Sequence, residues 1–326
     1  MRTSVYTIVL AESVTTFETL RTVEGQGNMN ILVTGGTGFI GSSLCRRLLG
    51  EGYRPSVLTR DRERVRQHLD EKIAALESLD EIQTEQAPEV IVNLAGRSLG
   101  SGRWTDALKQ TFVDSRVGTT QKVLAYIADA PVKPRLLVSG SAVGYYGARG
   151  DEDLDEYSGP RHEFQSDLCA SWEAEAVKAE DFGVRVCLLR TGVVLGKDGG
   201  ALSSLVPPFR LGLGGHLGDG RQWMSWIHMD DVIGMILFLI ANEELRGPFN
   251  CTAPNPETNR DFAKKLGRAL HRPVFTYVPG WLVRIKVGEM AHLFLTGQKV
   301  LPRRMLASGY DFQYPNLESA LAEVIS

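Results

Sequence analysis

Cysteine is scarce in this chain and follows no spacing that builds a redox or metal site. The sequence has four cysteines, none in a C-x-x-C pair: Cys45, Cys169, Cys187 and Cys251. We interpret them as buried or idle thiols of a reducing compartment, because disulfide frameworks and zinc ribbons need paired cysteines. The six histidines form no H-x-x-x-H or H-E-x-x-H pattern, so the sequence predicts no metal site.

Long apolar runs and an excess of one charge are also missing. No run reaches the roughly 18 apolar residues that a transmembrane helix needs. The 36 Lys and Arg and the 39 Asp and Glu leave a net charge of −3, which attracts neither nucleic acid nor an anionic membrane in bulk. These absences leave a small-molecule substrate as the expected partner, with no nucleic acid and no membrane.

The N-terminal segment fits no standard targeting signal. Its short apolar patch VYTIVLA is followed by Glu12, Glu18 and Glu24. A signal peptide has positive charge before a longer apolar core, and a transit peptide is poor in acids. We interpret residues 1–28 as a loosely ordered N-terminal extension or the result of an upstream start. A cytoplasmic location is expected, and organelle targeting by residues 1–28 stays open as an alternative.

From residue 30 onward, short apolar runs alternate with helical patterns. The runs NILVT, PSVLTR, EVIVNLAG, RLLVSGSA and VRVCLLRTGVVLG are typical of buried strands, and amphipathic stretches separate them. This alternation predicts right-handed βαβ crossovers and therefore a Rossmann-type, doubly wound parallel sheet in an α/β fold. We expect residues 29–195 to form this domain.

After Gly196 the composition changes. The stretch FRLGLGGHLGDGRQWMSWIHMDD is rich in glycine and tryptophan and does not fit a plain strand-helix unit. We expect residues 196–326 to form a small, mixed C-terminal substrate lobe over the strand ends. Within it, an apolar helix and a strand at about residues 230–253 should return to pack on the Rossmann domain.

The stretch VTGGTGFIG predicts a dinucleotide site. Gly35, Gly38 and Gly41 follow a G-x-x-G-x-x-G spacing, directly after the first core strand and at the start of a helix. Glycine allows the tight turn and lets backbone amides approach a pyrophosphate, which then lies at the helix N-terminus. The position between strand and helix is the context that gives this pattern its meaning.

The end of the second strand indicates which dinucleotide binds. An NAD site usually has Asp or Glu here to hold the ribose hydroxyls. This strand ends instead in Thr59 and Arg60, with Arg62 close behind. A guanidinium can bind a 2′-phosphate that a carboxylate would repel, so we favour NADP. Asp61 follows directly, and NAD therefore stays open as the alternative.

The run LLVSGSAVGYYGARG places hydroxyls and phenols in a glycine-rich loop at a strand end. Ser141, Tyr145 and Tyr146 are candidates for catalytic proton transfer. The alternatives are that the phenols line the pocket or pack, and that the serine closes the turn. Arg149 lies four residues after Tyr145, but the glycines argue against a helix and an arginine cannot relay a proton.

A second polar cluster lies in GDGRQWMSWIHMDD. Candidates for the substrate pocket are Arg221, Gln222, Trp226 and His228. A histidine can titrate near neutral pH, although a structural histidine is the favoured alternative here. For Asp230 we favour a helix N-cap.

These motifs together resemble the extended short-chain dehydrogenase/reductases. The similarity is greatest to the atypical branch of NAD(P)-dependent epimerase-like proteins, the SDR39U-type branch, some of which are labelled cell-division inhibitor homologues. It rests on TGGTGFIG, NLAG, SRVGTT, SAVGYYG, RTGVVLG and GDGRQWMSWIHMDD, and on the C-terminal GQKVLPRRMLASGYDFQYPNLESAL. About residues 275–322 would be the family-specific C-terminal region.

The resemblance implies a set of cofactor contacts. The pyrophosphate would lie on the loop that contains Gly35, Thr37, Gly38, Phe39, Ile40 and Gly41. The 2′-phosphate would lie against Thr59 and Arg60, and the adenine-ribose side against Leu94, Ala95 and Gly96. Arg116 would reach the cofactor, with an ordinary helix-surface charge as the alternative, and Val194 would pack near the nicotinamide.

The resemblance fails at the catalytic dyad. Members of the wider superfamily use Tyr-x-x-x-Lys on the helix after the serine strand, where the lysine lowers the pKa of the tyrosine. The matching helix here reads HEFQSDLCASWEAEA. If Glu173 marks the usual acidic residue, Gln165 takes the tyrosine position and Cys169 the lysine position. An amide and a thiol cannot replace the dyad, so the standard mechanism is absent.

Two functions follow from this combination. We favour an NADP-dependent, epimerase-like oxidoreductase that acts on a small polar or carbonyl-bearing molecule above the Ser141–Tyr145–Tyr146 loop. The alternative is a non-catalytic, NADPH-binding regulator or redox sensor, linked to cell or organelle division through the label on its relatives. A homodimer through the long helices that start near Trp104 and Phe164 is a further expectation from the superfamily.

Overall fold

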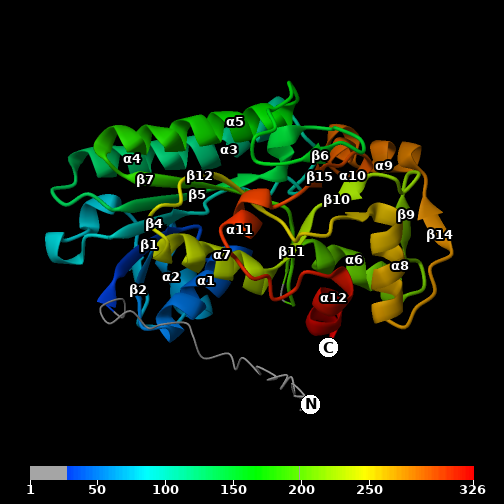
Figure 1. The fold of residues 1–326 in the computed structure, drawn as a ribbon, viewed down its shortest axis with the longest axis horizontal. Helices are drawn as coiled ribbons and strands as arrows, with labels where there is room; N and C mark the ends of the chain where they lie inside the picture. The colour runs from blue at the N-terminus through cyan, green and yellow to red at the C-terminus, as the bar shows by residue number, and fades with distance from the viewer. Residues whose placement is uncertain (1–27, 198) are drawn as a thin grey trace, which may run out of the picture.

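The computed structural model describes residues 28–197 and 199–326. The predicted N-terminal extension therefore lies outside the described residues, except for Asn28. The described chain is built around one parallel sheet, with helices on both of its faces and a smaller group of elements at one end (Figure 1).

Seven strands form the central sheet, and every neighbouring pair is parallel. In spatial order they are β12 (Gly247–Cys251), β7 (Arg185–Thr191), β5 (Leu136–Ala142), β4 (Val90–Asn93), β1 (Asn30–Thr34), β2 (Arg54–Leu58) and β3 (Ala74–Leu76). The inner strands are buried on both faces, as a parallel sheet covered by helices requires. This architecture confirms the predicted Rossmann-type fold. The strand order reverses between β1 and β4, and ligands of such sheets bind at the carboxyl ends of the strands beside that point.

Two layers of helices cover the sheet. One layer holds α3 (Asp106–Val113), α4 (Thr119–Asp129) and α5 (Phe164–Val177), above the sheet in Figure 1. The other holds α1 (Phe39–Gly50), α2 (Arg62–His68) and α7 (Met229–Ala241), below it in the same view. Val33, Leu44 and Ile236 belong to the core between the sheet and the lower helix layer. Leu32 and Ile127 belong to the core between the sheet and the upper helix layer. The apolar α7 and strand β12 thus complete the sheet domain from beyond residue 228.

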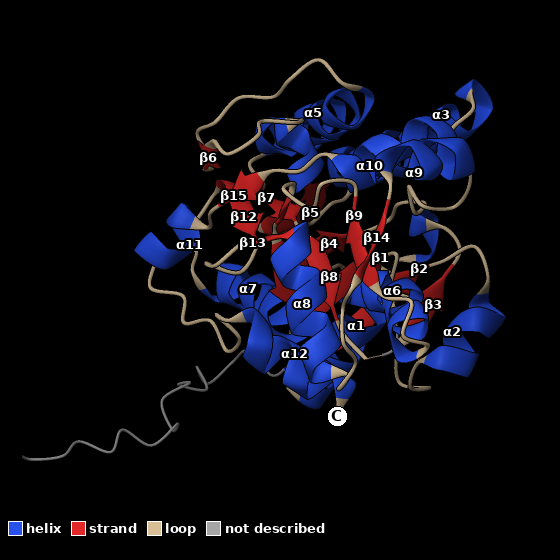
Figure 2. Ribbon diagram, turned by 90° about the vertical axis from the view of Figure 1, so that its right-hand side faces the viewer, coloured by secondary structure: helices blue, strands red, loops and turns tan. Residues whose placement is uncertain are grey.

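The remaining elements form a second lobe with its own core. It includes α6 (Gly200–Arg210), β9 (Gly215–Leu217), α8 (Asn259–Ala269), β14 (Thr276–Val278) and α12 (Leu317–Ile325). Leu202, Trp226, Phe262 and Leu321 are buried in this core. Figure 2, viewed from this end of the molecule, shows α8 and α12 in front of the sheet. The residues after position 198 form α6, which contains Pro207 and Pro208.

Short strand pairs join the two lobes near the carboxyl ends of the main strands. They are β8 (Val193–Leu195) with β11 (Trp226–His228), β10 (Trp223–Met224) with β13 (Glu257–Thr258), and β6 (Asp153–Leu154) with β15 (Lys299–Val300). The other helices are α9 (Gly280–Val287), α10 (His292–Leu295) and α11 (Arg303–Ala307). The 3-10 turns are η2 (Leu79–Glu81), η3 (Thr84–Gln86), η5 (Val143–Tyr146), η6 (Lys178–Phe182) and η7 (Gly288–Ala291). Met290 packs in one cluster with Trp104 and Leu168, so the C-terminal region lies against the start of α5.

Candidate functional site

The glycine loop between β1 and α1 lies at the strand-order reversal and is shaped by backbone contacts. Gly35 has a φ of +70°, and a Cβ on it would lie 2.8 Å from the carbonyl oxygen of Leu94. A Cβ on Gly41 would overlap the carbonyl oxygen of Gly35. Helix α1 begins after Gly38 with no side-chain cap and no acidic residue in its first turn. Its first amides are therefore available to an anionic ligand.

The carboxylate of Asp61 is turned toward its own helix. Its side chain caps α2 by accepting a hydrogen bond from the Arg64 amide at 3.1 Å. The hydroxyl of Thr59 accepts a hydrogen bond from the Asp61 amide at 3.1 Å, which closes the turn. Asp61 is the residue that kept NAD as the alternative cofactor. Its carboxylate is engaged as the cap of α2.

The two arginines after β2 differ in their partners. Arg62 forms ion pairs with Glu77 at 3.5 Å and with Glu81. Arg60 is exposed and has no hydrogen bond or ion pair with any described residue. Arg60 is therefore the guanidinium that this strand end leaves free for an anion.

Arg116 lies on the other side of the reversal, against the end of β4. It belongs to a π-helical turn (Asp114–Gly118) between α3 and α4, a feature that often marks functional positions. A Cβ on Gly96 would lie 3.1 Å from the guanidinium carbon of Arg116. Burial lowers the pKa of Arg116, and no carboxylate of a described residue pairs with it. A half-buried cation without a counter-ion beside a strand end suits an anionic ligand.

A buried hydrogen-bond chain fixes the loop after β4, and sequence reasoning missed the three side chains that form it. Thr34 donates to the Asn93 side chain at 2.6 Å and accepts from the Ala95 amide at 3.1 Å. Asn93 in turn donates to the hydroxyl of Thr120 at 2.8 Å. Polar residues inside the apolar runs NILVT and VIVN were the available signal. Leu94 packs in the same cluster as the partly buried Phe39, Ile40 and Val194.

Ser141 lies in a buried ion-pair network. Arg190 binds Glu173 through two hydrogen bonds of 2.9 Å and 2.8 Å, and both residues are buried. The Ser141 hydroxyl donates to the same carboxylate at 2.6 Å. Sequence reasoning did not identify Arg190, which follows an apolar run in strand β7.

The two phenols of η5 have different surroundings. Tyr146 is fully buried, donates to the Asn250 side chain at 2.6 Å and accepts from Arg190 at 3.0 Å. Burial raises the pKa of Tyr146 to about 12, so the phenol keeps its proton at neutral pH. Tyr145 is partly buried, and its ring packs on the Arg190 guanidinium at 3.5 Å. Its hydroxyl has no hydrogen bond with a described residue, so Tyr145 is the phenol that a ligand can reach.

Helix α5 presents an amide and a thiol to the loop after β5. A Cβ on Gly144 would lie 3.6 Å from the Cβ of Gln165 and 3.9 Å from the sulfur of Cys169. Burial raises the pKa of Cys169 to about 11, so this thiol stays protonated. The first lysine on the helix side, Lys178, lies at the far end of α5 and pairs with Glu175 at the surface. No described residue restores the tyrosine-lysine pair.

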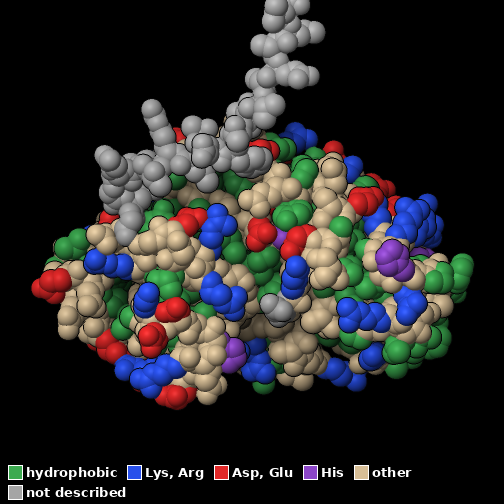
Figure 3. Space-filling view, turned by 90° about the horizontal axis from the view of Figure 1, so that it is seen from below, with side chains coloured by type: hydrophobic (Ala, Val, Ile, Leu, Met, Phe, Trp, Pro, Cys, Tyr) green, Lys and Arg blue, Asp and Glu red, His purple; other side chains and the backbone are tan. Residues whose placement is uncertain are grey.

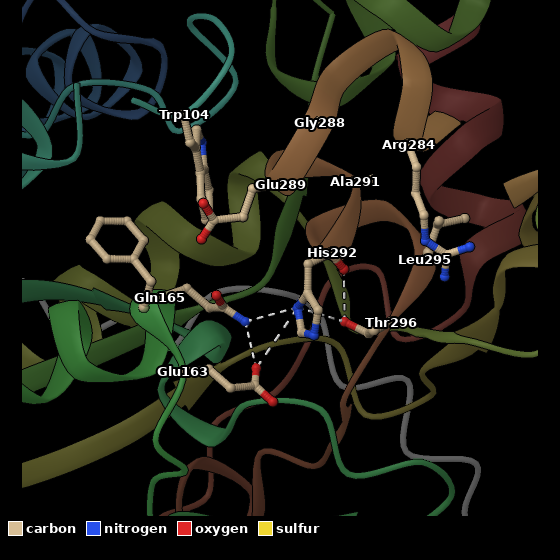
Figure 4. Close-up of a pocket in the computed structure, with 11 residues that line it drawn as sticks. Trp104, Glu163, Gln165, Arg284, Gly288, Glu289, Ala291, His292, Leu295 and Thr296 are labelled. Carbon is tan, nitrogen blue, oxygen red and sulfur yellow. Dashed lines mark hydrogen bonds and ion pairs between the residues drawn. The ribbon is translucent and has the colours of Figure 1, made fainter. Parts of the chain in front are cut away.

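A cavity of about 420 Å³ opens beside Gln165, between the start of α5 and the C-terminal region. Figure 4 shows His292 in its centre, Trp104 and Glu289 on one side and Arg284 on the other. Sequence reasoning singled out Gln165, at the position of the missing tyrosine, but did not select His292, Glu289 or Arg284. His292 and Gln165 are 127 positions apart, and no local pattern links them.

The second polar cluster predicted from the sequence, in GDGRQWMSWIHMDD, does not line the cavity beside Gln165. Trp226 is fully buried, and its indole donates to the Asn255 carbonyl at 2.9 Å. Gln222 donates to two backbone carbonyls, while Arg221 is exposed, and neither lines one of the two cavities described here. His228 is buried and accepts a hydrogen bond from the amide of Asp230.

The prediction of Asp230 as the helix cap was wrong, because His228 caps α7. The other ring nitrogen of His228 lies 3.0 Å from the Glu323 carboxylate, which also pairs with Lys197 at 3.0 Å. These residues line a second cavity of about 430 Å³ together with Thr37. On this side of the molecule, seen in Figure 3, acidic and basic side chains are intermixed over the described residues.

The described residues lack two further features, a cluster of metal ligands and a membrane-spanning helix. No group of three or more His, Cys, Asp or Glu side chains there is arranged to hold a metal ion. None of the helices in the described part of the chain combines the length and apolarity needed to cross a membrane.

Comparisons with known proteins place this geometry in a family. Residues 31–251 match the model of the NAD dependent epimerase/dehydratase family, and residues 278–324 match a domain of unknown function, DUF1731. The chloroplastic epimerase family protein SDR39U1 homolog of Arabidopsis thaliana is 38% identical over 95% of this chain and 90% of its own. An epimerase family protein of Staphylococcus haemolyticus is 39% identical over 90% of this chain and 98% of its own.

A solved structure extends the comparison. The human epimerase family protein SDR39U1, crystallised with NADPH, superposes with a TM-score of 0.81 and is 34% identical. The match covers 91% of this chain and 99% of the human one. From the sequence motifs, the sheet and these matches, the chain belongs to the NAD dependent epimerase/dehydratase family.

Proposed function

We propose that this protein is an NADPH-binding, epimerase-like oxidoreductase that acts on a small carbonyl-bearing molecule. The observation that carries the cofactor choice is the free guanidinium of Arg60 at the end of β2, beside an Asp61 carboxylate engaged as a helix cap. The NADPH in the human relative's structure supports the same choice.

The residues present fit such a cofactor. Gly35 and Gly41 allow a close backbone approach that a Cβ would block, and the first amides of α1 can bind a pyrophosphate. Arg60 would hold the 2′-phosphate, which is why we expect NADPH to be preferred over NADH. Arg116 and Gly96 would border the cofactor at the end of β4.

A bound nicotinamide supplies or accepts a hydride, and the protein must position the substrate and move a proton. Ser141 and Tyr146 are held in the buried network of Arg190, so they would shape the pocket floor. Tyr145 has a free hydroxyl and would contact the substrate. His292 beside Gln165 places an imidazole at the cavity.

A non-catalytic, NADPH-binding regulator is the second candidate. It is favoured by one observation, namely that Gln165 and Cys169 face Gly144 in place of an acid-base pair. An enzyme oxidises bound NADPH in the presence of a carbonyl compound, whereas a regulator binds NADPH without turning it over. Following NADPH absorbance against a panel of carbonyl compounds distinguishes the two.

The cofactor assignment is tested by titrating NADPH and NADH into the wild-type protein and Arg60→Ala. We expect wild type to bind NADPH at least tenfold more tightly than NADH, and Arg60→Ala to lose that preference while binding NADH as before. Arg54→Ala is the matched control, because Arg54 is also exposed and lies at the opposite end of β2. Equal affinities of wild type for the two cofactors would refute the assignment.

A further inference from the structure

The cavity beside Gln165 has a composition that the cofactor does not explain. None of the residues predicted to contact the cofactor lines it. Its volume of about 420 Å³ lies within the range of small-molecule sites. Its walls come from the first turn of α5, from α9 and α10, and from Trp104. The cavity therefore lies between the sheet domain and the C-terminal region.

The charges that line this cavity leave one cation without a partner. Glu289 is paired with Lys109 at 2.7 Å. Glu163 accepts a hydrogen bond from Gln165 at 2.6 Å and another from a backbone amide. The Arg284 guanidinium has no hydrogen bond or ion pair with any described residue. The carboxylates are thus occupied, and the available charge at the cavity is the guanidinium, which suits a carboxylate ligand.

Trp104 lies across the cavity from Arg284 in Figure 4, and Phe164 lines the same cavity. Trp104 and Phe164 pack edge to face with their centroids 5.1 Å apart. The Trp104 indole nitrogen donates to the Leu99 carbonyl at 2.9 Å, so its polar group is already satisfied. What this wall offers a ligand is apolar, aromatic surface.

His292 supplies a hydrogen-bond donor between these two walls. The Gln165 amide nitrogen lies 2.6 Å from the Glu163 carboxylate and 3.1 Å from Nδ1 of His292. A carboxylate accepts hydrogen bonds, which orients the amide so that its NH2 group faces both neighbours. Nδ1 of His292 faces this NH2 group and lies 3.8 Å from the Glu163 carboxylate, so Nε2, which has no partner among the described residues, is the ring nitrogen left to donate to a ligand.

We propose that this cavity binds a small aromatic carboxylate with a carbonyl next to the acid group. Arg284 binds the carboxylate, Trp104 and Phe164 contact the ring, and the Nε2–H of His292 donates to the carbonyl oxygen. This inference rests on the proposed function, because it takes the bound molecule to be of the class on which the oxidoreductase acts.

The test is calorimetric titration of the full chain with three probes, with and without saturating NADPH. Phenylglyoxylate carries the ring, the keto oxygen and the acid, its methyl ester lacks the charge, and phenylacetate lacks the keto oxygen. We expect phenylglyoxylate to bind at least tenfold more tightly than the ester and about threefold more tightly than phenylacetate, as one neutral hydrogen bond implies.

Each discrimination is assigned to one side chain. Arg284→Gln should bind acid and ester equally, whereas Lys286→Gln, an exposed cation on the same helix outside the cavity, should keep the difference. His292→Phe should lose the preference over phenylacetate and keep that over the ester. A wild-type protein that binds acid and ester within twofold, or an Arg284→Gln variant that still distinguishes them, overturns the proposal.

Failure of the cavity proposal can be distinguished from failure of the proposed oxidoreductase function. NADPH affinity, measured by nicotinamide fluorescence, should be unchanged in Arg284→Gln and His292→Phe. If wild type fails to bind NADPH but discriminates the three probes, the oxidoreductase proposal fails and the cavity keeps its ligand class. If NADPH binds as expected and the probes are not discriminated, only the cavity proposal fails.

Discussion

Arg190 connects the three residues that the sequence predicted to be catalytic. Its guanidinium binds Glu173, donates to the Tyr146 hydroxyl and packs against the Tyr145 ring. Ser141 joins through the same carboxylate. Two of the three hydroxyls that the sequence offered for chemistry therefore stabilise a buried charge.

Glu173→Gln should strongly destabilise the protein. The substitution removes the negative charge from a buried pair and leaves the Arg190 cation without compensation, which typically costs about 3–5 kcal/mol. Urea unfolding measures the change. Glu63→Gln, which removes an exposed surface pair with Arg66 on α2, should cost about 1 kcal/mol or less. Similar losses in both variants would show that the buried pair contributes no more to the free energy of unfolding than the surface pair.

Tyr146→Phe should lower the free energy of unfolding without changing NADPH affinity. The variant leaves the buried Asn250 oxygen without its donor, a loss of about 1–3 kcal/mol. Thermal unfolding and NADPH titration are the measurements. An unchanged melting temperature together with lost turnover would contradict this and assign Tyr146 a direct chemical role.

At the scale of elements, the start of α1 is a tightly constrained junction. The helix begins where the loop passes under the carbonyl of Leu94, and Gly35 and Gly41 allow the chain to make that approach. The π-helical turn at Asp114–Gly118 brings Arg116 to the same edge of the sheet. Both features position residues at the carboxyl ends of β1 and β4.

Gly41→Ala should therefore impair cofactor binding more than folding. The added methyl group overlaps the Gly35 carbonyl, so the loop must move away from the position that presents its amides. We expect NADPH affinity to fall at least tenfold while the circular dichroism spectrum is retained. Gly50→Ala, at the other end of α1, meets no atom within 4 Å and should bind NADPH normally. Equal affinity of the two variants would rule out this account of the loop.

At the scale of the whole molecule, the two lobes share the region around the candidate site. Strand β15 pairs with β6, and α7 with β12 returns the chain to the sheet domain. Met290 packs with Trp104, so the C-terminal region contributes to the same surface as the start of α5.

Cofactor binding should accordingly stabilise the whole chain. A ligand that binds only the folded state at a hundred times its dissociation constant adds about 2.7 kcal/mol. Differential scanning calorimetry with NADPH and NADH at equal concentration should show a larger rise in melting temperature with NADPH. In Arg60→Ala the two shifts should become equal. A larger shift with NADH in wild type would contradict the role of Arg60.

The sequence by itself determined the parts of this protein that depend on neighbouring residues. Periodic apolar runs are enough to predict a covered parallel sheet, and the spacing of Gly35, Gly38 and Gly41 is enough to predict the turn before α1. The strand end at Arg60 could be found in the same way, because strand, turn and helix follow one another directly.

Tertiary structure decided the rest, because burial and partners come from distant segments. Tyr146 is removed from solvent by Arg190 and Asn250, which lie 44 and 104 positions away. His292 meets Gln165 across 127 positions, a pairing that no local pattern encodes. The sequence offered Ser141, Tyr145, Tyr146 and His228 as candidates, and His292 was not among them. Packing sealed Tyr146 in a buried network and placed His292 at an open cavity, because desolvation and access depend on what folds against each group.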